Sequence, residues 1–265
     1  IKEGRPVELE PILPAAGRIK DYVHQTPVHS SALVSAQAGC DLVFKCENLQ
    51  RAGAFKARGA HNAVLSLPEE QRSRGVATHS SGNHAAALAL AASKVGVPAH
   101  IVMPENAPAP KIAAVRAYGG EITFCESTQV AREQTLEQLC ARTGAVFIPP
   151  YDHPDVVAGQ GTVALELTRQ LPEAPDYLLT PVGGGGLLGG CAVASKALWP
   201  DTRVIGAEPA GADDAMRSFR SGRRLPQSAP DTVADGLLTG LGALNFALIR
   251  KLGDDEDQQH DHGDQ

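Results

Sequence analysis

Four consecutive glycines, Gly183 to Gly186, lie in the stretch "PVGGGGLLGG". Glycine loses more backbone entropy on folding than any other residue, so such a run needs a physical reason. The preceding "DYLLTPV" predicts a buried strand, and the following "LLGGCAVASKALWP" predicts a helix. Loop N–H groups beside a helix N-terminus attract an anion, best a phosphate. The loop fits neither common nucleotide motif, so the identity of the phosphate stays open, and a flexible linker is the alternative.

A lysine and a hydroxyl-rich loop supply further reactive groups. Lys56 lies in "GAFKARGA", among small residues that allow another group to approach closely. A lone lysine is usually a solvated charge, but near a phosphate it would either contact that phosphate or form a Schiff base. The stretch "HSSGNHA", from His79 to Ala85, offers hydroxyl and N–H donors just before a helix. These donors suit a carboxylate, although simple helix capping is the alternative.

An acidic loop forms a separate candidate site. Glu208, Asp213 and Asp214 follow the strand-like "TRVIGA". Hard divalent cations take oxygen ligands, so the loop suits Mg²⁺ or Ca²⁺, whereas a solvated turn is the alternative.

These three loops require a scaffold of alternating strands and helices. Segments such as "GVATHS", "AHIVMP" and "EITFCE" predict strands, and each is followed by a segment with helical spacing. Repeated βα units predict a mostly parallel sheet with helices on both faces. Ligands in such folds bind beyond the carboxyl ends of the strands, where "SSGNH", "PVGGGG" and "EPAGADD" all lie.

The bulk composition excludes several classes of protein. The 265 residues are 43% apolar and 20% charged, as in soluble globular proteins. A net charge of −6 without a basic stripe argues against nucleic acid as a partner. We see no membrane-spanning apolar run and no signal peptide. Five scattered cysteines indicate reduced thiols and a cytoplasmic location.

The ordered motifs together resemble those of a known family. "GAFKARGA", "SSGNHA", "AGQGT", "PVGGGGLLGG" and "AEPAGADD" follow one another as in the fold-type-II pyridoxal-phosphate enzymes, in the branch of serine racemase and the serine/threonine dehydratases. The resemblance runs from "TPVHSSALVS" to "LIRKLGDD", nearly the whole chain.

This resemblance implies an α/β fold similar to the tryptophan synthase β-subunit, with two open, mostly parallel twisted sheets. It implies a large cofactor-binding domain from residues 1–74 and 153–265, and a small mobile substrate-binding domain from residues 75–152. The family continues past this endpoint, so we expect the C-terminal part to be missing and residues 254–265 to be disordered.

The resemblance also implies a role for each site residue. Lys56 would be the Schiff-base lysine and general base, and Ser81 the acid on the opposite face of the substrate. Glu208, the Ala212 carbonyl and Asp214 would hold Mg²⁺ or Ca²⁺ in a structural and activating role. The implied cofactor contacts are Phe55, Lys56, Asn83, Gly183, Gly184, Gly185, Gly186 and Leu187, and the implied carboxylate contacts are Ser80, Ser81, Asn83, His84 and Arg132.

The expected activity is that of a pyridoxal-phosphate-dependent L-serine/L-threonine ammonia-lyase, giving pyruvate or 2-oxobutyrate and ammonia, with serine racemisation as a side or main activity. The stretch "FIPPYDHPDV" favours a dehydratase. A threo-3-hydroxyaspartate ammonia-lyase is an alternative, and a non-catalytic binding protein for pyridoxal phosphate or a nucleotide is the alternative from another class. We expect a homodimer acting on a small hydroxy amino acid.

Overall fold

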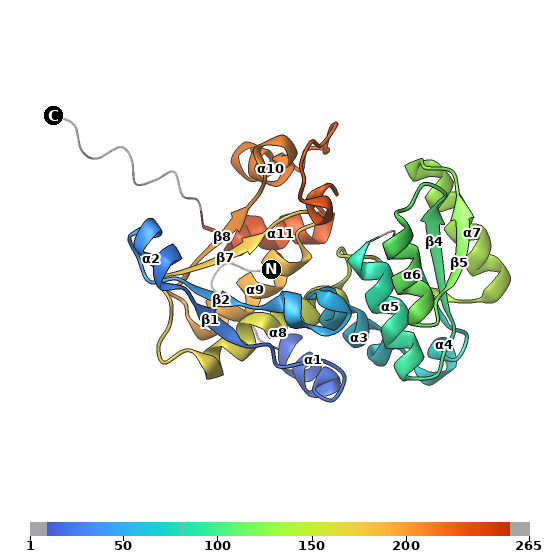
Figure 1. Ribbon diagram of the computed structural model, residues 1–265, viewed down its shortest axis with the longest axis horizontal. Helices are drawn as coiled ribbons and strands as arrows, with labels where there is room; N and C mark the ends of the chain where they lie inside the picture. Colours follow the sequence, from blue (N-terminus) through green and yellow to red (C-terminus); the bar gives the residue numbers. More distant parts are fainter. Residues whose placement is uncertain (1–9, 81, 255–265) are drawn as a thin grey trace.

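Strands and helices alternate along the chain and form three separate sheets (Figure 1). The computed structural model describes residues 10–80 and 82–254. Ser81 and the predicted tail after Asp254 therefore lie outside the described residues. The elements are α1 (Ile12–Ile19), β1 (Val28–Ser30), α2 (Ala32–Ala38), β2 (Val43–Lys45), η1 (Glu47–Leu49), η2 (Arg51–Gly53), α3 (Lys56–Ser66), α4 (Glu69–Arg72), β3 (Val76–His79), α5 (Asn83–Lys94), β4 (Ala99–Pro104), α6 (Ala109–Ala117), β5 (Glu121–Cys125), α7 (Gln129–Thr143), β6 (Val146–Phe147), α8 (Pro154–Gln170), β7 (Tyr177–Pro181), α9 (Gly186–Leu198), β8 (Arg203–Ala207), η3 (Ala210–Ala212), α10 (Asp214–Ser221), η4 (Asp235–Leu237) and α11 (Ala243–Leu252).

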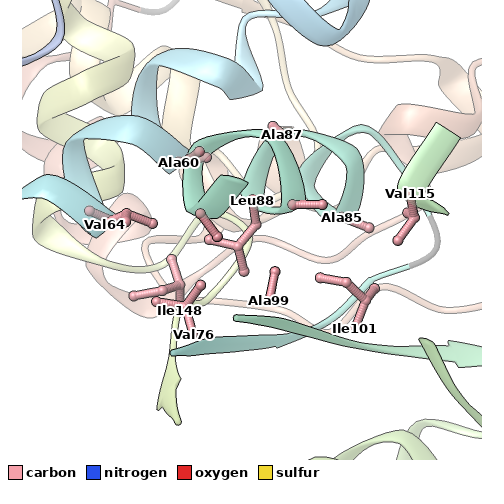
Figure 2. Packing of buried hydrophobic residues seen from close by; sticks show 14 of the residues in the cluster. Ala60, Val64, Val76, Ala85, Ala87, Leu88, Ala99, Ile101, Val115 and Ile148 are labelled. Carbon is pink, nitrogen blue, oxygen red and sulfur yellow. The ribbon is translucent and has the colours of Figure 1, made fainter. Parts of the chain in front are cut away.

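The largest sheet is parallel and has the strand order β5-β4-β3-β6. One face packs against α3, α5 and α6, and Figure 2 shows Leu88 of α5 beside Val76 and Ala99 of the strands. The other face packs against α7 through residues such as Leu136 and Leu139. Helices therefore cover both faces, as the βα pattern predicts.

The second predicted sheet occurs as two separate pairs of strands. β7 and β8 are parallel and pack against α9 and α11, whereas β1 and β2 form an antiparallel hairpin-like pair. The fold class predicted from the sequence is confirmed, and the β1–β2 pair is a feature that the sequence did not predict.

Closely packed helices connect the two halves of the molecule. An added Cβ at Gly159 of α8 would come within 2.6 Å of the Gly59 Cα atom in α3. One at Gly190 of α9 would come within 2.4 Å of the Val157 carbonyl oxygen in α8. Only glycine permits these approaches, so the "AGQGT" motif brings α3 and α9, the helices that begin at the lysine and the glycine loop, onto opposite sides of α8. None of the helices in the described ranges has both the length and the apolar character needed to cross a membrane.

Candidate functional site

Lys56 is the first residue of α3, and its amine is buried between two aromatic rings. The Nζ atom donates a hydrogen bond to the Pro150 carbonyl oxygen at 2.7 Å. It lies 5.2 Å from the Phe55 ring centroid and 5.8 Å from that of Tyr151. Burial lowers the pKa of Lys56 to about 8, because no carboxylate of the described residues forms an ion pair with it. A substantial fraction of this amine is therefore neutral near physiological pH and able to act as a nucleophile or base.

The glycine loop joins β7 to α9 and leaves donors without partners. The N–H groups of Gly183, Gly184, Gly185 and Gly186 have no hydrogen-bond acceptor among the described residues. Gly185 caps α9 in the left-handed region at φ +84°, and the buried Leu187 lies in the first turn of the helix. Free N–H groups and the positive end of α9 make this loop suitable for a phosphate.

Tyr151 connects the lysine to the glycine loop. Besides its approach to Lys56, its ring lies directly on the backbone of Gly184, where an added Cβ would come within 2.2 Å of Tyr151 Cγ. The sequence analysis quoted this segment but did not identify Tyr151 as a site residue. The available signal was an aromatic residue just after the carboxyl end of a predicted strand in a parallel sheet.

The "HSSGNHA" loop follows β3 at the carboxyl end of the largest sheet. Ser80 Oγ accepts a hydrogen bond from Gly82 N at 3.3 Å, and Asn83 is exposed at the start of α5. The His84 imidazole is buried, and its Nε2 atom donates to the Ile148 carbonyl oxygen at 3.1 Å. Burial, with the nearby Lys56, lowers the pKa of His84 to about 3, so the ring is neutral. His84 can therefore offer a ligand its backbone N–H group but not a charge.

Arg132 lies in the first turn of α7, beside the end of β3. Its Nε atom is buried and has no hydrogen-bond partner among the described residues. Burial lowers the pKa of His79, and the positive charge of Arg132 adds to this effect. A cation with an unpaired N–H donor beside the Ser80 loop is suited to bind a carboxylate.

The acidic loop crowds carboxylates together between β8 and α10. Glu208 accepts hydrogen bonds from Ala215 N at 3.2 Å and Met216 N at 2.8 Å, and Asp214 Oδ2 accepts one from Leu241 N at 2.8 Å. Burial raises the pKa of Glu208 to about 7, with further contributions from Asp214 and Asp213. Asp214 Oδ1 is buried without a partner, and burial raises the pKa of this residue too. Within residues 10–80 and 82–254, no three His, Cys, Asp or Glu side chains form a metal-binding group.

Comparison with known proteins shows which family shares these features. A family model described as "Pyridoxal-phosphate dependent enzyme" matches residues 19–259. The chain is 47% identical over 254 residues to a serine racemase of Arabidopsis thaliana, a match that covers 96% of this chain and 76% of that protein. It is 50% identical over 245 residues to L-threo-3-hydroxyaspartate ammonia-lyase of Saccharomyces cerevisiae, covering 92% of this chain and 75% of the relative.

Solved structures give the same result. Maize serine racemase superposes with a TM-score of 0.92 at 48% identity, covering 94% of this chain and 75% of that one. Serine racemase from Dictyostelium discoideum superposes with a TM-score of 0.89 at 46% identity, covering 93% and 79%. A bacterial-type relative named threonine deaminase superposes equally well, with a TM-score of 0.89 at 45% identity, covering 93% and 80%. The resemblance recognised in the sequence motifs is thereby confirmed.

Proposed function

This chain belongs to the pyridoxal-phosphate dependent enzyme family, and from that premise we propose that it is an ammonia-lyase for L-serine and L-threonine. The products would be pyruvate or 2-oxobutyrate with ammonia. The observation that carries this proposal is the buried, carboxylate-free amine of Lys56, which shares Tyr151 with a glycine loop of unpaired N–H groups.

The residues present fit pyridoxal phosphate, which the family implies. The cofactor needs an amine for its aldehyde and donors for its phosphate, and the structure has both. Lys56 would hold the aldehyde carbon, Phe55 would flank the ring and Asn83 would contact the ring hydroxyl. Gly183 to Gly186, with Leu187, would donate N–H groups to the phosphate. When bound, the cofactor supplies an electron sink that acidifies the Cα proton of an amino acid.

The substrate carboxylate would be bound at the carboxyl end of β3. Ser80, Asn83 and the His84 backbone N–H group are the proposed donors, with Arg132 adding charge. Ser81, which lies outside the described residues, belongs to the same proposal through its place in the motif.

Lys56 would also carry the proton. Its Nζ atom would accept the Cα proton, and a pKa of about 8 suits a base that works near neutral pH. Loss of the β-hydroxyl and hydrolysis of the resulting enamine would then give the keto acid and ammonia. Racemisation needs a second proton donor on the opposite face, and we propose Ser81 for that role.

A divalent cation would bind at the acidic loop. The support is the unpartnered Asp214 Oδ1 beside Glu208, in surroundings that raise the pKa of both carboxyl groups. The Ala212 carbonyl would be the third protein ligand, and Mg²⁺ and Ca²⁺ both suit oxygen donors.

The domain organisation, assembly and location remain proposals as well. We propose that residues 75–152 form a small mobile domain against a larger one made of residues 1–74 and 153–265. We further propose that the enzyme is a homodimer of the cytoplasm.

A second candidate activity is the elimination of ammonia from L-threo-3-hydroxyaspartate. The observation that favours it is the unpaired buried Nε atom of Arg132, since this substrate carries a second carboxylate. The relative from Saccharomyces cerevisiae, named for this activity, is 50% identical to the chain.

A side-by-side substrate assay tests both candidates. L-serine, L-threonine and L-threo-3-hydroxyaspartate are incubated separately with the protein and pyridoxal phosphate, and keto acid and D-isomer are measured together. We expect keto acid from L-serine and L-threonine, and none from any substrate with Lys56→Ala. Product from hydroxyaspartate alone, abolished by Arg132→Met, would replace the first candidate with the second.

Ser81→Ala separates the two reactions of serine. We expect L-to-D conversion to fall about 10²–10⁴-fold, the usual cost of losing a positioned acid, while L-serine elimination persists. Racemisation that survives while elimination disappears would exclude Ser81 as the second proton donor.

A further inference from the structure

Asn245 is a fully buried amide in the first turn of α11 that faces two loops of the site. Its Nδ2 atom donates to the Gly184 carbonyl oxygen at 2.7 Å and to the Tyr151 carbonyl oxygen at 3.2 Å. Because both neighbours are acceptors, the amide must present its NH₂ group to them. The Gly242 N–H group also donates to the Gly184 carbonyl, at 3.2 Å.

This contact determines the orientation of the glycine loop. The C=O and N–H groups of a trans peptide point in opposite directions. With the Gly184 carbonyl held against α11, the Gly185 N–H group of the same peptide points away from α11. That N–H group has no acceptor among the described residues and is one of the proposed phosphate donors. Gly185 lies directly on the helix, since an added Cβ there would come within 2.9 Å of Asn245 Cβ.

The same helix end is tied to the loop beside Lys56. Asp152 Oδ2 accepts a hydrogen bond from Ala243 N at 2.9 Å, and Oδ1 accepts from Leu244 N at 3.0 Å and Asn245 N at 3.3 Å. Asp152 directly follows Tyr151, and the preceding Pro150 carbonyl accepts the Lys56 amine. The start of α11 therefore fixes the loop that holds the amine and the loop that would hold the phosphate.

We propose that Asn245 is a positioning residue that sets the phosphate-binding orientation of the glycine loop. This inference rests on the proposed cofactor site and assigns it a residue from outside the loop. Packing alone does not explain an amide here, because Asn245 Oδ1 is buried without a partner. Burying an unpaired acceptor is unfavourable, and an apolar side chain would avoid that cost. What the amide adds beyond packing is its pair of hydrogen bonds to the Gly184 and Tyr151 carbonyls.

Two cofactor forms distinguish positioning from a general structural role. Apoprotein is titrated with pyridoxal 5′-phosphate and with pyridoxal, which has the same aldehyde but no phosphate, and binding is followed by absorbance. For Asn245→Ala we expect the dissociation constant of pyridoxal phosphate to rise about 10- to 100-fold, as for the loss of a buried hydrogen bond. The affinity for pyridoxal should be unchanged, because its aldehyde needs only Lys56.

Two further variants complete the test. Leu252→Ala truncates a buried residue at the far end of α11 and should change neither affinity. Asn245→Asp keeps the shape of the side chain but removes the donors, so it should reproduce the selective loss, and it serves if Asn245→Ala does not fold. Equal loss of both ligands, or no loss of either, would overturn the inference alone. Failure of the wild-type protein to bind pyridoxal phosphate would overturn the proposed function and this inference with it.

Discussion

Two buried cations lie only two residues apart in α3 and have opposite surroundings. The Arg58 guanidinium donates to both Glu47 oxygens, at 2.8 and 2.7 Å, and to both Glu166 oxygens, at 2.6 and 2.9 Å. Lys56 has one carbonyl and two aromatic rings. Burial alone would lower the pKa of Arg58, but its hydrogen bonds to Glu47 and Glu166 raise the pKa instead. Burial of Lys56 lowers its pKa to about 8.

The difference shows that the partner set, not burial, decides what a buried cation can do. Two carboxylates hold Arg58 as a permanent charge that joins η1, α3 and α8. The absence of a carboxylate partner among the described residues leaves Lys56 able to lose its proton and react. A structural cation and a reactive amine can therefore share one helix.

The largest expected effect is on the paired side of this comparison. Arg58→Met leaves Glu47 and Glu166 partly buried without their cation, which should lower the free energy of unfolding by about 3–5 kcal/mol. Urea denaturation at pH 7 measures the loss. Arg74→Met is the control, because Arg74 is exposed and pairs with Glu70 at 3.8 Å, and it should cost less than about 1 kcal/mol. Equal costs for the two variants would show that the Arg58 cluster is not a major source of stability.

The acidic loop is the converse case, with buried carboxylates and no described basic side chain bound to Glu208 or Asp214. If a cation completes it, saturating Mg²⁺ should raise the stability of the wild type, by about 2.7 kcal/mol at roughly 100 times the dissociation constant. Asp214→Asn should remove this gain, whereas Asp201→Asn, at an exposed position, should retain it. The melting temperature with and without Mg²⁺ is the measurement, and an unchanged wild-type value with both Mg²⁺ and Ca²⁺ would exclude the site.

The smallest effect at neutral pH is expected for Lys56→Met, opposite in sign to that of Arg58→Met. Removing an unpaired buried amine should leave the stability of the cofactor-free protein unchanged or slightly higher. The folded pKa of about 8 lies below the unfolded value of about 10.4, so the unfolded chain binds more protons between these pH values. The stability of the wild type relative to Lys56→Met should therefore rise as the pH increases through that window. A difference that stays constant from about pH 7 to 10.5 would contradict a lowered pKa.

Much of the scaffold could be predicted from local patterns. The strand predicted in "GVATHS" is β3, and those predicted in "DYLLTPV" and "TRVIGA" are β7 and β8. Their apolar content and the helical spacing that follows each are properties of neighbouring residues. The β1–β2 pair was not predicted, because each strand has only three residues and their pairing depends on distant packing.

The contacts that assemble the site could not be predicted from one sequence. Asn245 lies 61 residues from Gly184 and 94 from Tyr151, and nothing local in "GLGALNFALIRKL" indicates these hydrogen bonds. The "AGQGT" motif was recognised only as part of a resemblance, and its physical role appears once α3, α8 and α9 are packed together. The proposed roles of Lys56, Ser81 and the acidic loop remain predictions.

Reductive trapping tests the central claim, that the unpaired Lys56 amine is the group that reacts with an aldehyde cofactor. The protein is incubated with pyridoxal phosphate, reduced with borohydride and digested, and the modified peptide is identified by mass spectrometry. We predict a single modified lysine, Lys56, while the carboxylate-bound Lys45 stays unmodified. Modification of Lys45, or modification spread over the exposed lysines with Lys56 untouched, would contradict the account.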